Sequence, residues 1–444
     1  MSSYTTKKTP GDTSWFTRDR FGMFIHWGLY AMPARHEWVK SYEMMSEEDY
    51  EKYFQFFDPD MYDAREWARM AKAAGMKYAV MTTKHHDGFC LFDSKYTDYK
   101  STNTPARRDL IREFVDAFRA EGLKIGFYYS LIDWHHPEFT IDVLHPRRED
   151  KDAFDVNSKR DMKVYVEYMH NQVKELLTGY GEISYLFFDY SYTEYKPKEG
   201  YEWQRGKGRD DWESERLIET VRSIAPNILI NSRADIDQDV WAPEQYQPLE
   251  WLKHKKTNEL LTWEAVHTFS GSWGYHRDEM TWKSPVQLIR LLIDSVALGG
   301  NLMMNAGPTA RGFFDERAVS ALDVYAKWMK YNNKSIYGCT MAEPEFTPPV
   351  DCRYTQSNTG DHLYLHLTSY PHKFVELPGM ADKVAYAQFL HDGSEVKMVT
   401  PHNSVNNNFT YLERERDYPD NFLALRVPDV KPDVIVPVIE LILK

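Results

Sequence analysis

The chain has 444 residues, of which 42% are hydrophobic and 15% aromatic, enough for one large domain and a smaller one. Its formal net charge of -13 argues against a nucleic-acid-binding surface, and no segment is long and apolar enough to span a membrane. The three cysteines fit neither a zinc motif nor a disulfide framework. Because the first residues contain no apolar segment of the secretory kind, we expect a cytoplasmic protein, or a secreted one if an export signal has been removed.

Up to about residue 340, apolar strand-like runs alternate with amphipathic helical segments. The expected strands cover residues 22–25, 76–81, 124–129, 183–188, 227–230 and 301–304. The expected helices cover residues 62–74, 109–120, 159–180, 214–223 and 285–299. Repeated strand–helix units over roughly 300 residues favour an α/β fold, and a (β/α)8-like barrel over an open sheet. We assign residues 1–342 to this barrel.

The pattern of apolar and polar residues changes near residue 343. A proline-rich connector covers residues 343–349, and beyond it apolar and polar residues alternate with a period of two. The expected strands cover residues 363–367, 384–387, 422–425 and 434–436. Alternation of this kind, broken by turn signals, predicts a small antiparallel β-sandwich over residues 343–444.

Several expected strands of the barrel end in side chains that suit sugar chemistry. The run Ser184–Phe188 is apolar and delivers Asp189 at its C-terminal end, where α/β barrels carry their active sites. Taken singly, such a residue could merely cap a turn. Together the strand ends and the loops after them supply an aromatic-walled cleft with imidazoles, a guanidinium and several carboxylates. Carbohydrate hydrolysis needs this set, because two carboxyl groups must flank the scissile bond while hydrogen bonds hold the ring.

The two acids of such a pair need different environments. We expect Asp189 to stay ionised, because Arg233 or nearby imidazoles favour the charged form. Glu244 follows a proline in a loop beside Trp241, and we expect partial burial there to raise its pKa so that it can protonate the leaving oxygen.

Five motifs, in order along the chain, carry a resemblance to a known family. They are GMFIHWG at 22–28, KHHDGF at 84–89, GFYYS at 126–130, WE at 263–264 with SWGY at 272–275, and GNLMMNAGP at 300–308. In this combination the chain resembles the retaining α-L-fucosidases of glycoside hydrolase family 29 over about residues 14–340, and its tail resembles that family's C-terminal β-sandwich. The resemblance implies a barrel, a double-displacement mechanism without metal or organic cofactor, and a small fucosylated saccharide as substrate.

The resemblance also implies roles for individual residues. Asp189 matches the family's nucleophile, and Glu244 best matches its acid/base, with Glu264 as the rival. The expected substrate-binding residues are His26, Glu37, Trp38, His85, His86, Tyr128, Phe187, Arg233, Glu264 and Trp273. The chain departs from the family pattern beside the nucleophile, where Phe187 replaces an indole and Tyr190 replaces a small residue. These two changes put the shape of the site, and hence its linkage preference, in question.

Two other readings stay open. The chain could be a fucose-binding protein without catalysis, although both acids are present. It could also be a metal-dependent hydrolase that uses His85 and His86, although adjacent histidines are a weak metal signal. The sequence leaves open the linkage, the aglycone (the group attached to fucose), the tolerance for related sugars and a homo-oligomeric state.

Overall fold

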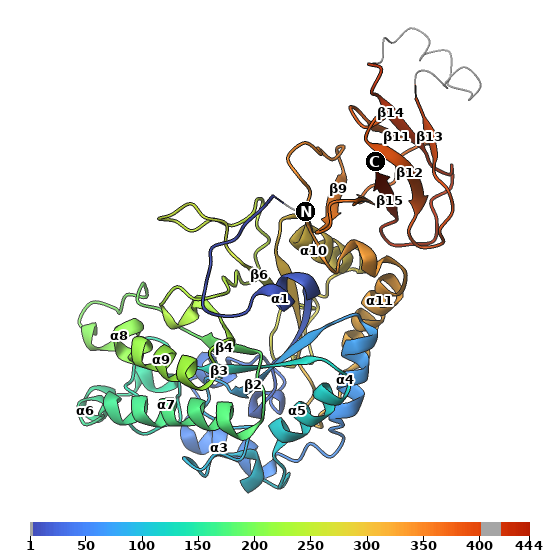
Figure 1. The fold of residues 1–444 in the computed structure, drawn as a ribbon. Helices are drawn as coiled ribbons and strands as arrows, with labels where there is room; N and C mark the ends of the chain where they lie inside the picture. Colours follow the sequence, from blue (N-terminus) through green and yellow to red (C-terminus); the bar gives the residue numbers. More distant parts are fainter. Residues whose placement is uncertain (1–2, 401–418) are drawn as a thin grey trace.

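The computed structural model describes residues 3–400 and 419–444, and its larger part is a curled parallel sheet wrapped by helices (Figure 1). The strand order in the sheet is β5-β4-β3-β2-β1-β7-β6, and all neighbouring strands pair in parallel. The strands are β1 Phe21–Ile25, β2 Tyr78–Lys84, β3 Lys124–Ser130, β4 Tyr185–Asp189, β5 Leu229–Ile230, β6 Glu264–Thr268 and β7 Asn301–Ala306.

An extended segment, residues 240–245, closes the gap between the two edge strands. It forms isolated parallel bridges to both sides, Asn231 to Val240 on the β5 side and Glu244 to Val266 on the β6 side. Backbone hydrogen bonds accompany them, including 2.9 Å from the amide of Gln245 to the carbonyl of Val266. Counted with this closing segment, the described residues supply eight parallel segments, so the expected (β/α)8-like barrel is confirmed in its main feature.

Helices follow most of the strands and cover the outside of the barrel. They are α4 Ala64–Ala73, α5 Leu110–Ala120, α7 Met162–Gly179, α9 Ser214–Ile224, α10 Pro285–Ala297 and α11 Glu316–Asn332. Asp63, Asp109, Asp161, Ser284 and Asp315 cap the starts of five of them with their side chains. In the described part of the chain, no α-helix stands between β5 and the closing segment or between that segment and β6.

Shorter helices lie in the loops. They are α1 Ser14–Asp19, α2 Val39–Tyr42, α3 Glu47–Phe56, α6 Ala153–Asn157 and α8 Arg209–Trp212, with short 3-10 turns that include η5 Ser232–Ala234. None of the helices among the described residues has both the length and the apolar character that crossing a bilayer requires.

Alternation along β4 decides which side chains enter the barrel. Tyr185 and Phe187 belong to the cluster that fills the interior, whereas Leu186 and Phe188 pack outward against the helices. Because successive strand residues face opposite sides, Asp189 points inward with Tyr185 and Phe187. The sequence run looked uniformly apolar because both faces of this strand are buried.

The C-terminal part forms two antiparallel sheets that share one apolar core and lie beside α10 and α11 (Figure 1). The five-stranded sheet has the order β12-β15-β10-β9-β8, and the three-stranded sheet has the order β11-β14-β13. The strands are β8 Cys339–Met341, β9 Cys352–Ser357, β10 His362–Leu367, β11 Phe374–Leu377, β12 Val384–Phe389, β13 Lys397–Val399, β14 Leu423–Arg426 and β15 Val438–Leu443. The expected β-sandwich is thereby confirmed.

The last strand of the sandwich begins later than expected, and the boundary between the two domains is not sharp. Residues 434–436 form bends, and the strand begins only at Val438, after Pro437, because proline cannot donate a ladder hydrogen bond. The domain boundary at residue 343 stays a prediction. The strand just before it, β8, already pairs with β9 of the second domain.

Candidate active site

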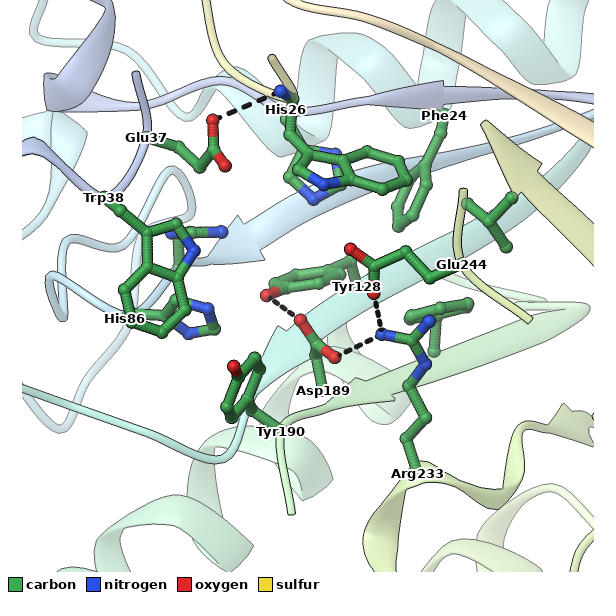
Figure 2. Close-up of a pocket in the computed structure, with 14 residues that line it drawn as sticks. Phe24, His26, Glu37, Trp38, His86, Tyr128, Asp189, Tyr190, Arg233 and Glu244 are labelled. Atoms are coloured by element: carbon green, nitrogen blue, oxygen red, sulfur yellow. Dashed lines mark hydrogen bonds and ion pairs between the residues drawn. The ribbon is translucent and has the colours of Figure 1, made fainter. Parts of the chain in front are cut away.

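A pocket of about 350 Å³, partly open to solvent, lies at the C-terminal ends of the barrel strands (Figure 2). Its lining residues are Phe24, His26, Glu37, Trp38, His85, His86, Tyr128, Phe187, Asp189, Tyr190, Arg233, Glu244, Val266 and Trp273. All the site residues expected from the sequence lie here, with the exception of Glu264. Within the described residues, the C-terminal β-sandwich contributes no side chain to the lining.

Asp189, the last residue of β4, is held by two donors. Its Oδ2 accepts a 2.8 Å hydrogen bond from the Tyr128 hydroxyl, and its Oδ1 lies 2.8 Å from Nη1 of Arg233. The side chain is 12% exposed, so the carboxylate faces the pocket while most of it is shielded from water. Burial and the neighbouring carboxylate raise the pKa of Tyr128 well above its usual value, so this hydroxyl remains a donor.

Arg233 joins the two acids of the pocket (Figure 2). The same Nη1 atom that contacts Asp189 also lies 2.8 Å from Oε2 of Glu244, and Nη2 donates to the carbonyl of Ala242. Burial lowers the pKa of Arg233, but Glu244 and Asp189 outweigh this effect and raise it above its usual value. Because both carboxylate oxygens lie 2.8 Å from one nitrogen, they cannot be farther apart than twice that distance.

Glu244 lies on the closing segment, near the end that opens into the pocket. Its side chain is 41% exposed, and Trp241 beside it is also exposed. The side chain of Glu244 is therefore less buried than we expected. The physical reason is its position at the open mouth, on the side of the barrel where the chain forms no covering helix in the described residues.

Three imidazoles stand side by side in the pocket. His26 directly follows β1 and bonds through Nδ1 to Asn305 at 2.7 Å, and His86 bonds through Nδ1 to Ser130 at 2.6 Å. Burial lowers the pKa of His26 and of His86 to about 3, and that of His85 well below its usual value. All three are therefore neutral near pH 7, and a neutral imidazole can donate to or accept from a sugar hydroxyl.

His85 and His86 can both face the pocket because they follow strand β2 and so do not point to opposite sides as strand neighbours would. β2 stops at Lys84, whose buried ammonium pairs with Asp133 at 3.0 Å. The chain then turns, with the amide of Gly88 bonded to the carbonyl of His85. Gly88 has φ of 81°, and a Cβ there would lie 2.3 Å from Asp133, so only glycine permits this turn.

Glu37 is buried and binds the backbone of the loop that contains Trp273 and Gly274. Its Oε2 accepts hydrogen bonds from the amides of Gly274 at 2.9 Å and Trp273 at 3.2 Å. These bonds hold the Trp273 ring 5.1 Å from the His26 ring. Burial raises the pKa of Glu37. The next residue, Trp38, packs edge-on against His86.

The expectation that Glu264 binds substrate, or rivals Glu244 as acid/base, is wrong. Glu264 is the first residue of β6, at the end of the strand away from the pocket, and it is fully buried. Its carboxyl accepts hydrogen bonds from the hydroxyls of Tyr78 and Tyr185. Burial raises its pKa to about 8. The Trp-Glu motif therefore belongs to the base of the barrel.

Three lining residues were not among those expected. Phe24 lies two residues before His26 on β1, so the period of two along a strand would have placed it on the same face. Val266 lies within β6, a strand that the sequence analysis did not identify. Tyr190 follows Asp189, and the sequence analysis noted it only as a departure from the family pattern.

Among residues 3–400 and 419–444, no group of three or more His, Cys, Asp or Glu side chains is arranged to hold a metal ion. No observation therefore favours the metal-dependent reading of His85 and His86.

Comparisons with known proteins identify the relatives of this architecture. A family model described as alpha-L-fucosidase matches residues 2–334. The structure of alpha-L-fucosidase isoenzyme 1 from Paenibacillus thiaminolyticus is 44% identical, with a TM-score of 0.86 over 97% of this chain and 98% of that chain. Plasma alpha-L-fucosidase of Homo sapiens is 28% identical over 392 residues, covering 81% of this chain and 76% of its own length.

A further solved structure bears on the chemistry of this group. A GH29 alpha-L-fucosidase from Bacteroides thetaiotaomicron was trapped as a covalent intermediate with 2-fluoro-fucosyl fluoride, in a mutant that replaces a glutamate by glutamine. It is 27% identical to this chain, with a TM-score of 0.80 over 99% of this chain and 98% of that one.

Proposed function

The chain belongs to the α-L-fucosidase family of glycoside hydrolases, and we propose that it releases α-L-fucose from small fucosylated oligosaccharides or glycoconjugates with retention of configuration. The resemblance drawn from the sequence motifs is confirmed at the level of the family. The proposal adds the mechanism, the roles of individual residues and the class of substrate.

One observation carries the mechanism: Asp189 and Glu244 contact the same nitrogen of Arg233. Retaining glycosidases have their two carboxyl groups about 5–5.5 Å apart, whereas inverting enzymes hold them about 6.5–9.5 Å apart to admit a water molecule. Because the two oxygens that contact the shared nitrogen are at most twice 2.8 Å apart, the two carboxyl groups are closer than those of inverting enzymes. The covalent intermediate trapped in the Bacteroides thetaiotaomicron relative supports the same mechanism.

In the first step, we propose that a carboxylate oxygen of Asp189 bonds to the anomeric carbon of fucose. The bond from that carbon to the glycosidic oxygen breaks, and Glu244 gives its proton to the departing oxygen. In the second step Glu244 takes a proton from water, the resulting hydroxide attacks the anomeric carbon, and the bond to Asp189 breaks. Two inversions at one carbon give net retention.

The other lining residues hold the sugar. The neutral imidazoles of His26, His85 and His86 can exchange hydrogen bonds with its hydroxyls, and Nδ1 of His85 is buried without a hydrogen-bond partner among the protein atoms described. The methyl group of fucose would contact the aromatic rings that line the pocket, such as Phe187. Tyr128 and Arg233 keep the Asp189 oxygens oriented.

The test uses an aryl α-L-fucoside and follows the first-formed sugar by NMR. Wild-type protein should release α-L-fucose. Glu244→Ala should lose most of its turnover, and azide should restore part of it by attacking the intermediate to give α-L-fucosyl azide. Asp189→Ala should lose roughly three orders of magnitude or more in kcat. With azide it should yield only the β-azide, because the single displacement inverts.

Several results would contradict the proposal. Release of the β anomer by wild type would show an inverting enzyme. Full activity in Glu244→Ala would remove this residue from the mechanism. Fucose binding without any turnover would favour the non-catalytic sugar-binding protein instead.

A further inference from the structure

We propose that four aromatic side chains at the edge of the pocket bind the pyranose ring to which the fucose is attached. These residues, Trp38, Tyr42, Tyr190 and Tyr195, are called the aromatic rim below. The proposal rests on the proposed function, because it identifies the aglycone as a sugar. It assigns the rim to substrate recognition beyond the fucose itself.

The rim continues the wall of the pocket outward into solvent. Trp38 lines the pocket, and Tyr42 at the end of α2 stacks on it with ring centroids 5.7 Å apart and planes inclined by 24°. Tyr42 is 64% exposed, so the stack reaches from Trp38 in the pocket wall to a tyrosine ring in contact with solvent. A group that leaves the pocket on this side meets a flat aromatic surface.

The second half of the rim comes from the loop after β4. The ring of Tyr190 lies 5.4 Å from that of Trp38, which connects the two halves. The ring of Tyr192 lies 5.3 Å from that of Tyr190 and 6.1 Å from that of Tyr195, which is 45% exposed. Trp38, Tyr42 and Tyr190 therefore form one patch from the pocket to the surface, and the Tyr192 ring connects Tyr195 to it.

The backbone of Tyr190 indicates that its ring has a function. Tyr190 has φ of 121°, a value at which glycine is comfortable and a bulky L-residue is strained. Strain of this kind persists where the surroundings hold it, and it concentrates at functional sites. Here contacts with Trp38, His86 and Tyr192 hold the ring in place. A glycine would remove the strain and also the ring at the pocket mouth.

The chemistry of the rim matches a sugar ring better than a purely apolar group. A pyranose presents C–H groups on its faces, which pack on aromatic rings, and hydroxyls around its edge. Tyrosine offers both an apolar ring and a hydroxyl that can donate or accept. The two exposed members of the rim, Tyr42 and Tyr195, are both tyrosines. Continuity with the proposed fucose pocket makes the sugar joined to fucose the fitting occupant.

The test compares two substrates that share fucose and differ in the leaving group. One is the fucosyl disaccharide that wild-type protein cleaves fastest from a panel of linkages. The other is α-L-fucosyl fluoride, whose leaving group is a single atom and cannot reach the rim. For Tyr42→Ala and for Tyr195→Ala, the ratio of kcat/KM for disaccharide to that for fluoride should fall roughly five- to tenfold. The loss should appear mainly in KM for the disaccharide.

Tyr331→Ala is the matched control. Tyr331 is 50% exposed in the last turn of α11, at the end of the helix away from the pocket mouth, and this variant should keep both rates. An unchanged ratio in both rim variants would overturn the proposal, and so would an equal loss on both substrates. Cleavage of the fluoride by wild type without cleavage of any disaccharide would also overturn it. If wild type cleaves neither substrate, the proposed function itself fails.

Discussion

Arg233 is the residue on which the geometry of the pocket depends. A single nitrogen of its guanidinium contacts both Asp189 and Glu244 at 2.8 Å. Two carboxylates this close would repel each other, and the cation between them makes their approach favourable. A second nitrogen donates to the carbonyl of Ala242, which fixes the plane of the guanidinium. Lysine could supply the charge but not this planar arrangement of donors.

Tyr190 allows a direct measurement of backbone strain at the pocket. Tyr190→Gly and Tyr190→Ala both remove the ring, but only alanine keeps a Cβ at φ of 121°. We therefore expect the free energy of unfolding of Tyr190→Gly to exceed that of Tyr190→Ala by about 1 kcal/mol. In an ordinary extended or helical position the order would be reversed, because glycine loses more backbone entropy on folding. Urea denaturation of the two variants makes the comparison, and greater stability of the alanine variant would refute the strained conformation.

The side chains of the site were largely accessible to sequence reasoning. Asp189, His26 and Arg233 each follow an apolar run, and residues at strand ends in a barrel converge on one mouth. What the sequence could not supply is the set of distances, such as the shared nitrogen between Asp189 and Glu244. These depend on the closure of the barrel, which no local pattern encodes.

At the scale of the elements, β6 accounts for the wrong assignment of Glu264. The run Glu264–Thr268 begins with a carboxyl and contains a histidine, so it lacks the apolar character that revealed the other strands. Once it is recognised as a parallel strand, its first residue must lie at the base of the barrel. There Glu264 joins Tyr78 and Tyr185 in the buried interior.

The burial of Glu264 predicts a pH-dependent stability. Its pKa is raised from an ordinary 4.5 to about 8 in the folded protein. Between these values the folded state holds the proton and the unfolded state does not, so the stability from this group is present below about pH 4.5 and is lost as the pH rises through 8. Glu264→Gln presents an acceptor oxygen and an N–H donor group that does not titrate, and so resembles a protonated carboxyl. We expect its melting temperature to exceed that of wild type by a few degrees at pH 8 to 9, with no such gain at pH 4.5 to 5.

Turnover of the same variant provides the control. Because Glu264 lies outside the pocket, Glu264→Gln should keep wild-type kcat on an aryl fucoside. A large loss of kcat in folded Glu264→Gln would show that Glu264 takes part in catalysis. A stability difference that does not depend on pH would instead contradict the protonated state of the buried carboxyl.

The closing segment shows a second limit of sequence reasoning at this scale. Residues 240–245 complete the barrel through isolated bridges and carry Glu244, yet their apolar run covers only residues 240–242 and ends at a proline. The segment is extended because β5 and β6 each offer it an unpaired edge. Its conformation is set by those distant neighbours, so its own sequence predicts only a loop.

At the scale of the whole molecule, the β-sandwich supports the barrel from outside the site. Trp328 of α11 donates to the carbonyl of Val436 at 3.0 Å, and Arg353 of β9 pairs with Asp294 of α10 at 3.0 Å. The lining residues of the pocket all lie between Phe24 and Trp273. The two-part organisation was visible in the change from strand–helix units to period-two alternation. The packing of one part on the other was not, because it depends on single contacts between residues far apart in the chain.

The central claim is that Asp189 and Glu244, brought together from separate segments of the barrel, act as nucleophile and acid/base. The most direct measurement treats Glu244→Gln with 2-fluoro-fucosyl fluoride and locates the adduct by mass spectrometry of the digested protein. The account predicts one fluorofucosyl group, on the peptide that contains Asp189, and none when Asp189→Asn is added. An adduct on any other residue, or turnover of the reagent with no covalent species, would contradict it.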